Sequence, residues 1–295
     1  MTSGEAWTIR RLLEWTGAFL ARKGVDSPRL SAELLLAHVL KCARIRLYTD
    51  YNRVVTDEHL ALYRDLVRRA AEHQPIAYLT GTAHFFNLEF EVTPDVLIPR
   101  PDTETLVENV IQSARLQGGL EAPRVLDLCT GCGCIAAAVA CNLKAATVVA
   151  TDISGAAVAV AKRNMQRLGL SDRVTVVQGD LYEALAQIPD AGQFNLILAN
   201  PPYIPTDRIA SLDRSVRDYE PLAALDGGRD GLMVHRRILA DAPRHLSRGG
   251  KVYLEIGADQ AEAAIALAEQ SEGLVEPRIL KDYGGNPRVL TVARK

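Results

Sequence analysis

From about residue 102 onward, short β-rich runs alternate with helical segments, and this alternation constrains the fold more than any other feature of the chain. Between two of the runs, residues 154–170 have the apolar spacing of an amphipathic crossover helix. Strands joined by such helices form a parallel sheet covered on both faces, and they bind ligands at their carboxyl ends. The sequence therefore predicts an α/β domain built on strands at residues 124–128, 146–152, 173–180, 194–200 and 250–257.

The first 80 or so residues have a different pattern, with apolar positions at helical spacing in residues 8–24, 27–41 and 56–74. Ser27 and Thr56 are predicted N-caps, and Pro28 suits a first helical position. These segments predict a small helical bundle. In the next segment Phe86, Leu88, Phe90 and Val92 alternate with polar residues as in a half-buried strand, within a β connector that ends at Pro99.

Charge and composition exclude several classes of protein. The formal net charge is −2 and the pI is near 6.3, which disfavours a protein that coats nucleic acid. No stretch approaches the roughly 20 apolar residues of a membrane span, and the N-terminal segment lacks a leader pattern. We expect a soluble cytoplasmic protein that uses no membrane.

Five cysteines are present, and three of them lie in "LCTGCGCIA" (residues 128–136). An odd number crowded into one turn predicts reduced thiols rather than a disulfide framework. Cys129, Cys132, Cys134 and Cys141 lack the paired spacing of a structural zinc site, so no metal is expected.

Glycines and carboxylates follow three successive predicted strands. Gly131 and Gly133 in "CTGCG" allow a tight turn and close approach of a ligand, Asp152 ends the second strand, and Asp180 ends the third. Each has a simpler alternative, namely a strand-to-helix turn, an N-cap for a helix beginning near Ser154, and a turn residue. Their coincidence at successive strand ends favours a ligand that contains adenosine, with Asp152 accepting the ribose hydroxyls.

The fourth strand ends in Asn200, Pro201, Pro202 and Tyr203. The two prolines have no N–H group and a fixed φ, so their carbonyls can be held outward as acceptors. The Asn200 oxygen is a second acceptor, and Tyr203 offers a flat face. These groups suit a planar –NH2 group, and the alternative is a rigid loop without chemistry.

Asn-Pro-Pro-Tyr in this position resembles the amino-group S-adenosylmethionine methyltransferases. Four longer stretches resemble one branch, the protein-(glutamine-N5) methyltransferases of peptide chain release factors, or PrmC/HemK family. They are "QPIAYLTGTAHFFNLEFEVTPDVLIPRPDTETLVE", "VLDLCTGCGCIAAAVA", "VRDYEPLAALDGGRDGL" and "KDYGGNPRVLTVAR". The resemblance runs from about Gln74 to the C-terminus, with a looser helical match before it.

The resemblance implies a Rossmann-like, seven-stranded class I methyltransferase domain preceded by a small helical bundle and a β-hairpin linker. The corresponding ranges are 1–82 for a helical substrate-recognition domain, 83–101 for the linker and 102–295 for the methyltransferase domain. Within "IPRPDTE", residues 100–104 are either a helix start capped by Asp102 or Thr103, or a segment that shapes the site. "DGGRDG" (residues 226–231) is expected to be a surface turn with glycines at positive φ.

The resemblance also implies S-adenosyl-L-methionine as cofactor, with S-adenosyl-L-homocysteine as product. The residues assigned to it are Cys129, Thr130, Gly131, Cys132, Gly133, Asp152, Asp180, Leu181 and Asn200. Those assigned to the substrate amide are Asn200, Pro201, Pro202 and Tyr203. One position departs from the family, because Cys129 stands where glycine is usual. Leu181 stands where the family varies, often with an aromatic residue against adenine.

The implied reaction is methyl transfer to N5 of the glutamine in the Gly-Gly-Gln motif of class I release factors, which tunes translation termination. An amide nitrogen is a poor nucleophile, so alignment and hydrogen-bond acceptors are expected to act rather than a histidine base. We expect a monomer with a release factor as partner and no direct nucleic acid contact. The alternatives are a ribosomal-protein glutamine N5-methyltransferase, a DNA adenine-N6 methyltransferase and a non-enzymatic nucleotide-binding adaptor.

Overall fold

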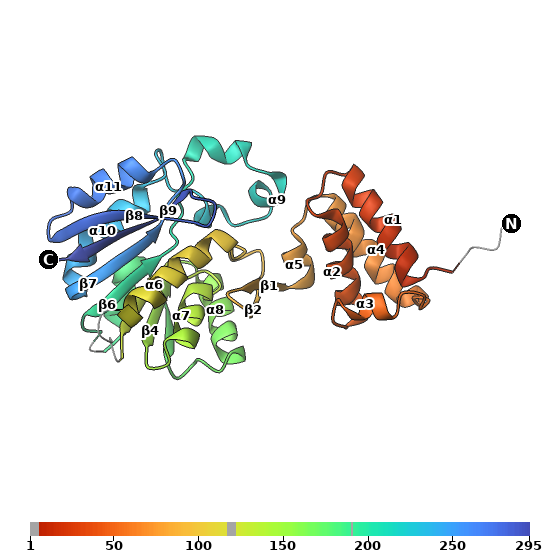
Figure 1. Ribbon diagram of the computed structural model, residues 1–295, viewed down its shortest axis with the longest axis horizontal. Coiled ribbons are helices and arrows are strands. Elements are labelled where there is room, and N and C mark those ends of the chain that lie inside the picture. The colour runs from red at the N-terminus through yellow and green to blue at the C-terminus, as the bar shows by residue number, and fades with distance from the viewer. Residues whose placement is uncertain (1–5, 117–121, 190) are drawn as a thin grey trace. The chain divides into compact units, whose positions relative to one another are not determined.

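The computed structural model describes residues 6–116, 122–189 and 191–295 (Figure 1). The chain divides into two compact units, one of residues 1–82 with 213–219 and the other of residues 83–212 with 220–295. The division assigned to residues 1–82, 83–101 and 102–295 stays a prediction, and within those ranges residues 1–5, 117–121 and 190 lie outside the described residues. No helix in the described ranges is long and apolar enough to cross a membrane.

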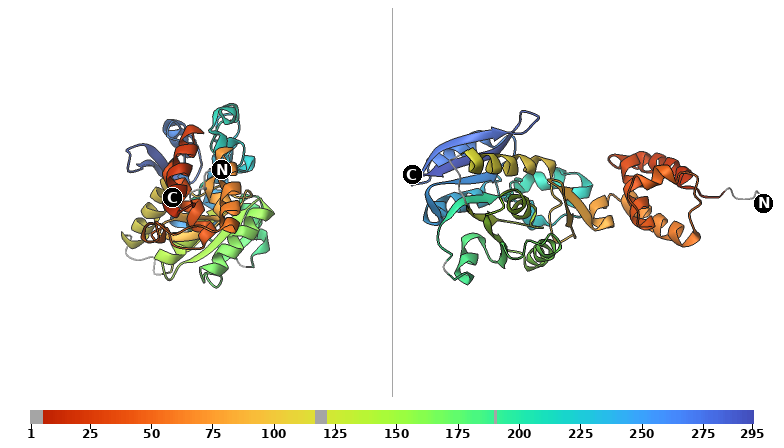
Figure 2. Two further views of the ribbon diagram at one scale, coloured as in Figure 1. Left: turned by 90° about the vertical axis from the view of Figure 1, so that its right-hand side faces the viewer. Right: turned by 60° about the horizontal axis from the view of Figure 1, so that its bottom comes forward.

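The first unit is helical, and its red and orange helices gather into one bundle (Figures 1 and 2). The bundle surrounds an apolar core in which Leu20, Leu35, Leu36 and Leu47 are completely buried. Its elements are α1 (Ile9–Arg22), α2 (Pro28–Leu40), α3 (Arg46–Thr49), α4 (Asp57–Ala71) and α5 (Ile76–Thr80), and the unit also includes α9 (Arg214–Arg217).

The helix starts of this unit confirm the two predicted cap positions. Thr56 caps α4 and accepts a hydrogen bond from the backbone N–H of His59. Ser27 stands at the N-cap of α2 but has a left-handed φ of 46° and makes no capping hydrogen bond with its side chain. The predicted N-cap position of Ser27 and first-turn position of Pro28 are therefore confirmed, but the Ser27 side chain does not reach the first turn as it would from extended backbone.

Residues 82–91 form a two-stranded hairpin, which confirms the hairpin implied by the family resemblance, whereas the local alternation had indicated one strand starting at Phe86. The strands β1 (Thr82–Phe85) and β2 (Leu88–Glu91) are joined by Phe86 and Asn87, which have φ of 51° and 61°. Two consecutive positive φ values match the tight turns that best fit strand twist, and they interrupt the predicted alternation. The buried Asn164 amide holds the hairpin, because it exchanges two hydrogen bonds with the Glu91 backbone and also donates to the Cys132 carbonyl at 2.9 Å.

The second unit contains a seven-stranded sheet of order β5-β4-β3-β6-β7-β9-β8. Its strands are β3 (Arg124–Leu128), β4 (Thr147–Asp152), β5 (Val174–Gln178), β6 (Phe194–Ala199), β7 (Leu246–Glu255), β8 (Leu274–Lys281) and β9 (Pro287–Arg294). The first five strands in this order are parallel, as predicted, but β9 is antiparallel to both β7 and β8. The five residues between β8 and β9 are too few for a crossover, so these two strands, which lie outside the five predicted from local pattern, pair in antiparallel fashion.

Helices cover both faces of the sheet (Figure 1). One face carries α6 (Glu104–Leu116), α7 (Cys134–Asn142) and α8 (Gly155–Arg167), and α8 confirms the predicted crossover helix. The other face packs its core against α10 (Met233–His245) and α11 (Ala261–Glu269). Short 3-10 turns complete the unit: η1 (Pro101–Thr103), η2 (Leu181–Gln187), η3 (Thr206–Ser211) and η4 (Leu222–Ala224).

Strand register brings three loops to the same edge of the sheet. Leu128, the last residue of β3, pairs with Thr151 of β4 on one side and with Ala199 of β6 on the other. The chain therefore leaves β3, β4 and β6 within one residue of a common level, and their loops share the carboxyl edge where ligands bind in such sheets.

Candidate active site

A cavity of about 660 Å³ opens at this carboxyl edge. Its wall includes most of the predicted site residues: Cys129, Thr130, Gly131, Cys132, Asp152, Asp180, Leu181, Asn200 and Pro202. Gly133, Pro201 and Tyr203 do not line it. Residues that follow four different strands thus meet in one cavity.

The loop after β3 is built from left-handed backbone. Cys129, Gly131 and Gly133 have φ of 57°, 55° and 84°. A Cβ on Gly133 would lie 2.7 Å from the Met165 methyl group, so glycine is needed there for close packing as well as for its φ. Cys129 adopts a conformation that costs a side-chain-bearing residue about 1 kcal/mol or more, which explains why glycine suits this position.

Asp152 organises the loop beside it. Its Oδ2 accepts from the Gly131 N–H and its Oδ1 accepts from the Ser154 N–H, both at 2.9 Å. Burial raises the pKa of this carboxyl, and the two backbone hydrogen bonds oppose the rise. Ser154 itself caps α8 through the Ala157 N–H, so the alternative of Asp152 as the N-cap is wrong.

Asp180 and Leu181 follow β5 and also line the cavity. Asp180 Oδ2 forms an ion pair with Arg237 of α10 at 2.8 Å. Leu181 is nearly buried and has a left-handed φ of 49°. Asp180 is therefore tied to α10 and is more than the residue before a turn.

Asn200 leaves β6 with its amide group anchored on one side. Its Nδ2 donates to the Thr103 hydroxyl at 3.1 Å, and no residue in the described ranges donates to its Oδ1. The amide oxygen is thus the group that remains to accept a hydrogen bond in the cavity. Of the two cap candidates in "RPDTE", Thr103 is the residue that contacts the predicted site, whereas Asp102 pairs with Arg288 at 3.0 Å.

Tyr203 is directed away from the cavity wall and into the protein. Its hydroxyl donates to Glu255 Oε1 at 3.2 Å, and its backbone carbonyl accepts from Gln260 Nε2 at 2.9 Å. Burial raises the pKa of the phenol, and the nearby Glu255 carboxylate adds to the rise. The role of its ring as a flat face for the substrate stays a prediction.

The glycines of residues 226–231 pack against the Asn-Pro-Pro-Tyr loop and are not all on the surface. Gly228 and Gly231 have the expected positive φ, but Gly227 does not. A Cβ on Gly227 would lie 2.7 Å from the Pro202 carbonyl oxygen, and one on Gly231 would lie 2.2 Å from that of Tyr203. Gly227 and Gly231 are buried, so the prediction of a surface turn is wrong for these two.

Sequence reasoning did not single out two buried carboxyls near the site. Asp127 of β3 is completely buried, and its Oδ2 accepts from the Thr130 hydroxyl at 2.5 Å and from the Ala136 N–H at 3.2 Å. Burial raises its pKa to about 7. Glu255 at the end of β7 is 1% exposed. A charged residue inside an apolar strand is the sequence signal that could have identified both, because burying a charge is costly unless the charge is paired or hydrogen-bonded.

The cysteines of the loop carry free thiols. Burial raises the pKa of Cys129, and the carboxylates of Asp152, Asp127 and Asp180 raise it further. The thiol is therefore neutral and a poor nucleophile. Within the described ranges, no three His, Cys, Asp or Glu side chains are arranged to hold a metal ion.

Comparison with known proteins places the chain in a family. Residues 11–81 match the model of the PrmC N-terminal domain, and residues 102–211 match the methyltransferase small domain. A release factor glutamine methyltransferase of Rhodopirellula baltica is 42% identical over 98% of this chain and 97% of its own length. The chain belongs to the release factor glutamine methyltransferase family. The relative from Geobacter sulfurreducens is 43% identical over 97% of this chain and 96% of its own length.

A solved structure outside this family shares the fold. The hMettl16 catalytic domain in complex with MAT2A 3′UTR hairpin 1 aligns with a TM-score of 0.56 and 16% identity, over 95% of this chain and 91% of the other. At this identity the likeness supports the fold of the chain and nothing about its function. The sheet, its covering helices and the preceding helical region confirm the predicted class I methyltransferase fold.

Proposed function

We propose that the protein transfers a methyl group from S-adenosyl-L-methionine to the side-chain amide nitrogen of the glutamine in the Gly-Gly-Gln motif of class I release factors. One observation carries the proposal beyond family membership. The amide of Asn200 is held by Thr103 with its oxygen left to accept, on the wall of the cavity that Asp152 also lines. Asn200, an acceptor for an –NH2 group, and Asp152, a carboxylate suited to a ribose, thus line the same cavity.

The residues of the cavity fit the cofactor. Each oxygen of Asp152 accepts one backbone N–H and keeps a further lone pair for a ribose hydroxyl. The glycine-containing loop 129–133 brings backbone close to the cavity, and Leu181 offers an apolar surface for a base. S-Adenosyl-L-methionine supplies the electrophilic methyl group, and Asp152, Asp180, Leu181 and the loop would hold it at the carboxyl edge of the sheet.

The chain's own residues would act by binding, alignment and polarisation. The Asn200 oxygen, on the cavity wall, would accept an N–H bond of the substrate amide and favour the positive charge that develops on nitrogen. The second acceptor assigned to the Pro201 carbonyl lies outside the cavity lining. Correct alignment of reacting groups can contribute about 7 to 11 kcal/mol in favourable cases. The apolar wall excludes water from the reacting atoms. The methylated nitrogen is acidic enough to lose its proton without a dedicated base.

The glutamine that receives the methyl group must reach Asn200 from outside the cavity. This requirement limits the local structure that the substrate protein can have around that glutamine. A glutamine flanked by glycines can enter a narrow opening, since its neighbours carry no side chains that would collide with the rim. This demand and the family relationship together favour the Gly-Gly-Gln loop of release factors. Release factors act in the cytoplasm, so we infer that the protein acts there too.

The test is methylation of an intact class I release factor followed by mass spectrometry. We expect one added methyl group, located on the glutamine of the Gly-Gly-Gln motif and absent when that glutamine is replaced. A methyl group on another residue, or none, would contradict the proposal. Parallel reactions with ribosomal proteins and with duplex DNA test the two enzymatic alternatives, and methyl transfer of any kind excludes the adaptor.

A further inference from the structure

Asp180 stands where a helix cap would stand but does not act as one. It precedes η2 with extended backbone, from which an aspartate ordinarily accepts a backbone N–H of the first turn, yet its side chain makes no capping hydrogen bond. Its Oδ2 instead accepts from Arg237 Nη2 at 2.8 Å, and no residue in the described ranges donates to its Oδ1. The carboxylate is therefore oriented by α10 rather than by its own turn.

The backbone around Asp180 fixes its place in the cavity. The Gly179 N–H donates to the Asp152 carbonyl at 2.9 Å, which ties the end of β5 to the end of β4. A Cβ on Gly179 would lie 2.7 Å from the Ala184 Cα, so a side chain here would displace η2. Leu181 follows with a φ of 49°, a strained conformation of the kind that collects at binding sites. Asp180 thus stands between two tightly determined residues.

Arg237 lines the same cavity, and stability does not explain its pairing with Asp180. The two side chains are 48% and 33% exposed, and ion pairs this open to water add little to the free energy of unfolding. An arginine can only donate hydrogen bonds, so it occupies one oxygen of the carboxylate and leaves the other as an acceptor. The pair therefore presents an oriented acceptor to a ligand in the cavity.

We propose that Arg237 is a positioning residue that selects the base of the cofactor, because it holds Asp180 with Oδ1 ready to accept the exocyclic amine of adenine. The inference rests on the proposed function, since it assumes that the cavity binds an adenosyl cofactor. A base with a carbonyl oxygen in place of that amine offers no proton there, so the two oxygens repel each other and binding weakens. Arg237 acts through Asp180 and need not touch the base.

The test compares two ligands by calorimetry, S-adenosyl-L-homocysteine and S-inosyl-L-homocysteine, which carry the amine and the carbonyl respectively. Wild-type protein should bind the adenosyl compound about tenfold or more tightly, the difference expected for a hydrogen bond to a charged group. Arg237→Met removes the donor and should reduce this preference to about threefold or less. A role in packing alone would weaken both compounds equally. Equal Kd values in wild type, or an Arg237→Met variant with the wild-type preference, would overturn the proposal.

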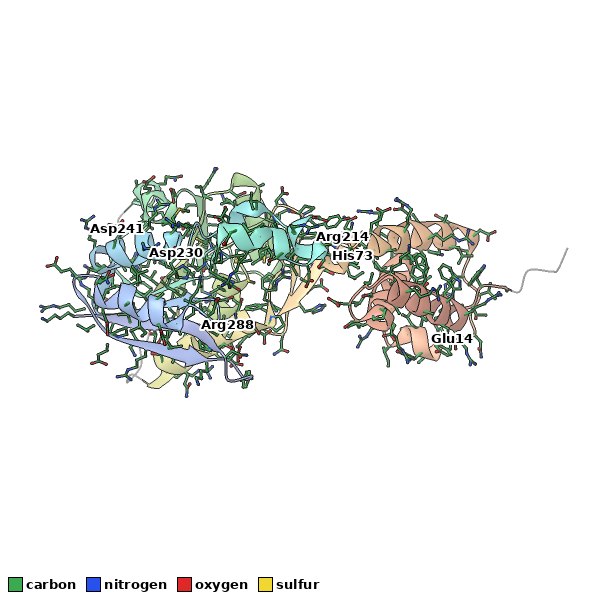
Figure 3. All side chains as sticks on the ribbon, turned by 90° about the horizontal axis from the view of Figure 1, so that it is seen from above. Glu14, His73, Arg214, Asp230, Asp241 and Arg288 are labelled. Carbon is green, nitrogen blue, oxygen red and sulfur yellow. The ribbon has the colours of Figure 1, made fainter. Side chains whose placement is uncertain are left out.

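Arg236, the preceding residue of α10, provides a matched control. Its side chain is also 48% exposed, and it pairs with Asp230, which is labelled in Figure 3 and does not line the cavity. Arg236→Met should therefore leave the preference at its wild-type value. A loss as large as that in Arg237→Met would show that the effect does not pass through Asp180, and would also overturn the proposal.

Asp180→Asn should reverse the preference. Arg237 would occupy the amide oxygen of the new side chain, because it can only donate, and would leave the –NH2 group for the base. That group can donate to a carbonyl but cannot accept from an amine, so the inosyl compound should bind more tightly than the adenosyl one. In the double variant Asp180→Asn/Arg237→Met the amide can turn either way, and the preference should nearly vanish. Equal preferences in the single and double variants would refute the role of Arg237.

The same measurements separate this inference from the proposed function. A wild-type protein that shows the expected preference but does not methylate a release factor would refute the acceptor assignment alone. Methylation of the release factor by wild type, together with an Arg237→Met variant of unchanged preference, would refute the positioning role alone. Binding of neither compound by wild type would refute the cofactor assignment on which both depend.

Discussion

The Asn200 side chain donates to the Thr103 hydroxyl at 3.1 Å, a contact that joins residues 97 positions apart in the sequence. It ties the end of β6 to the 3-10 turn that precedes α6. An acceptor at the carboxyl edge is thus oriented by a residue from a different part of the unit, and substitutions on either side of the contact test the site.

Asn200→Ala should nearly abolish methyl transfer, because the substrate amide loses its acceptor. Cofactor binding should weaken less, since Asp152 and loop 129–133 remain. Turnover and calorimetric titration of the cofactor would be measured side by side, with Asn142→Ala at the end of α7 as control. Turnover of Asn200→Ala within a few-fold of wild type would show that the role given to Asn200 is wrong.

Asp152→Ala should raise the cofactor Kd at least about tenfold, equivalent to about 1.4 kcal/mol. It removes the proposed ribose acceptor and also leaves the Gly131 and Ser154 N–H groups without their partner. The melting temperature should therefore fall as well. Calorimetry and thermal unfolding separate the two effects, and an unchanged Kd with a lowered melting temperature would reduce Asp152 to a structural residue.

Cys129→Gly should keep or improve activity and should not lower the melting temperature. Glycine adopts the observed φ of 57° without the steric cost that a side chain incurs, and it restores the residue usual in the family. Activity and thermal unfolding of Cys129→Gly and Cys129→Ala would be compared. A folded but inactive Cys129→Gly would mean that the thiol has a function.

His235 should make the protein less stable in acid. Its folded pKa of about 4 lies below its ordinary 6.5, so the unfolded chain binds the extra proton between these values. Neutral His235 therefore contributes to the free energy of unfolding in full above pH 6.5. This contribution is lost as the pH falls through 4, and the total loss is about 3 kcal/mol. Urea unfolding from pH 7 to 4 should show the gap between wild type and His235→Gln shrinking by this amount, and parallel curves would contradict the assignment.

Gly231→Ala should lower both stability and turnover far more than Gly249→Ala. The two glycines have φ of 74° and 71°, so the backbone strain is matched. A Cβ at Gly231 would lie 2.2 Å from the Tyr203 carbonyl oxygen, whereas one at Gly249 has nothing within 4 Å. Equal losses in thermal unfolding and turnover would show that packing behind the Asn-Pro-Pro-Tyr loop is unimportant.

The local pattern of apolar residues predicted the strands and helices that are encoded in consecutive residues. The strand at residues 124–128 and the helix α8 appear where expected, because a buried strand or an amphipathic helix is encoded in consecutive residues. β8 and β9 were not predicted as strands, since their burial alternates irregularly and the pairing between them contains register shifts. The turn at Phe86 and Asn87 was missed because it lies within an alternation that otherwise suits one strand.

The site was only partly predictable for a related reason. Residues at strand ends, such as Asp152 and Asn200, can be found by counting along the chain, because the sheet brings those ends together. Thr103 and Glu255 contact the Asn-Pro-Pro-Tyr loop through tertiary packing, which no local pattern encodes. The same holds for Gly231, whose closest neighbour is a carbonyl 28 positions earlier in the chain.

The register that joins Leu128 to Thr151 and Ala199 sets how far Asp152, the proposed cofactor contact, lies from Asn200, the proposed substrate contact. Backbone hydrogen bonds between the strands fix this separation, so replacing side chains at the strand ends leaves it unchanged. Adding one residue within β6 would slip the pairing and turn alternate side chains to the opposite face. The sheet therefore holds the strand ends at a fixed separation. A redesign of this enzyme for another acceptor can replace Asn200 or its neighbours but must leave the strand lengths unchanged.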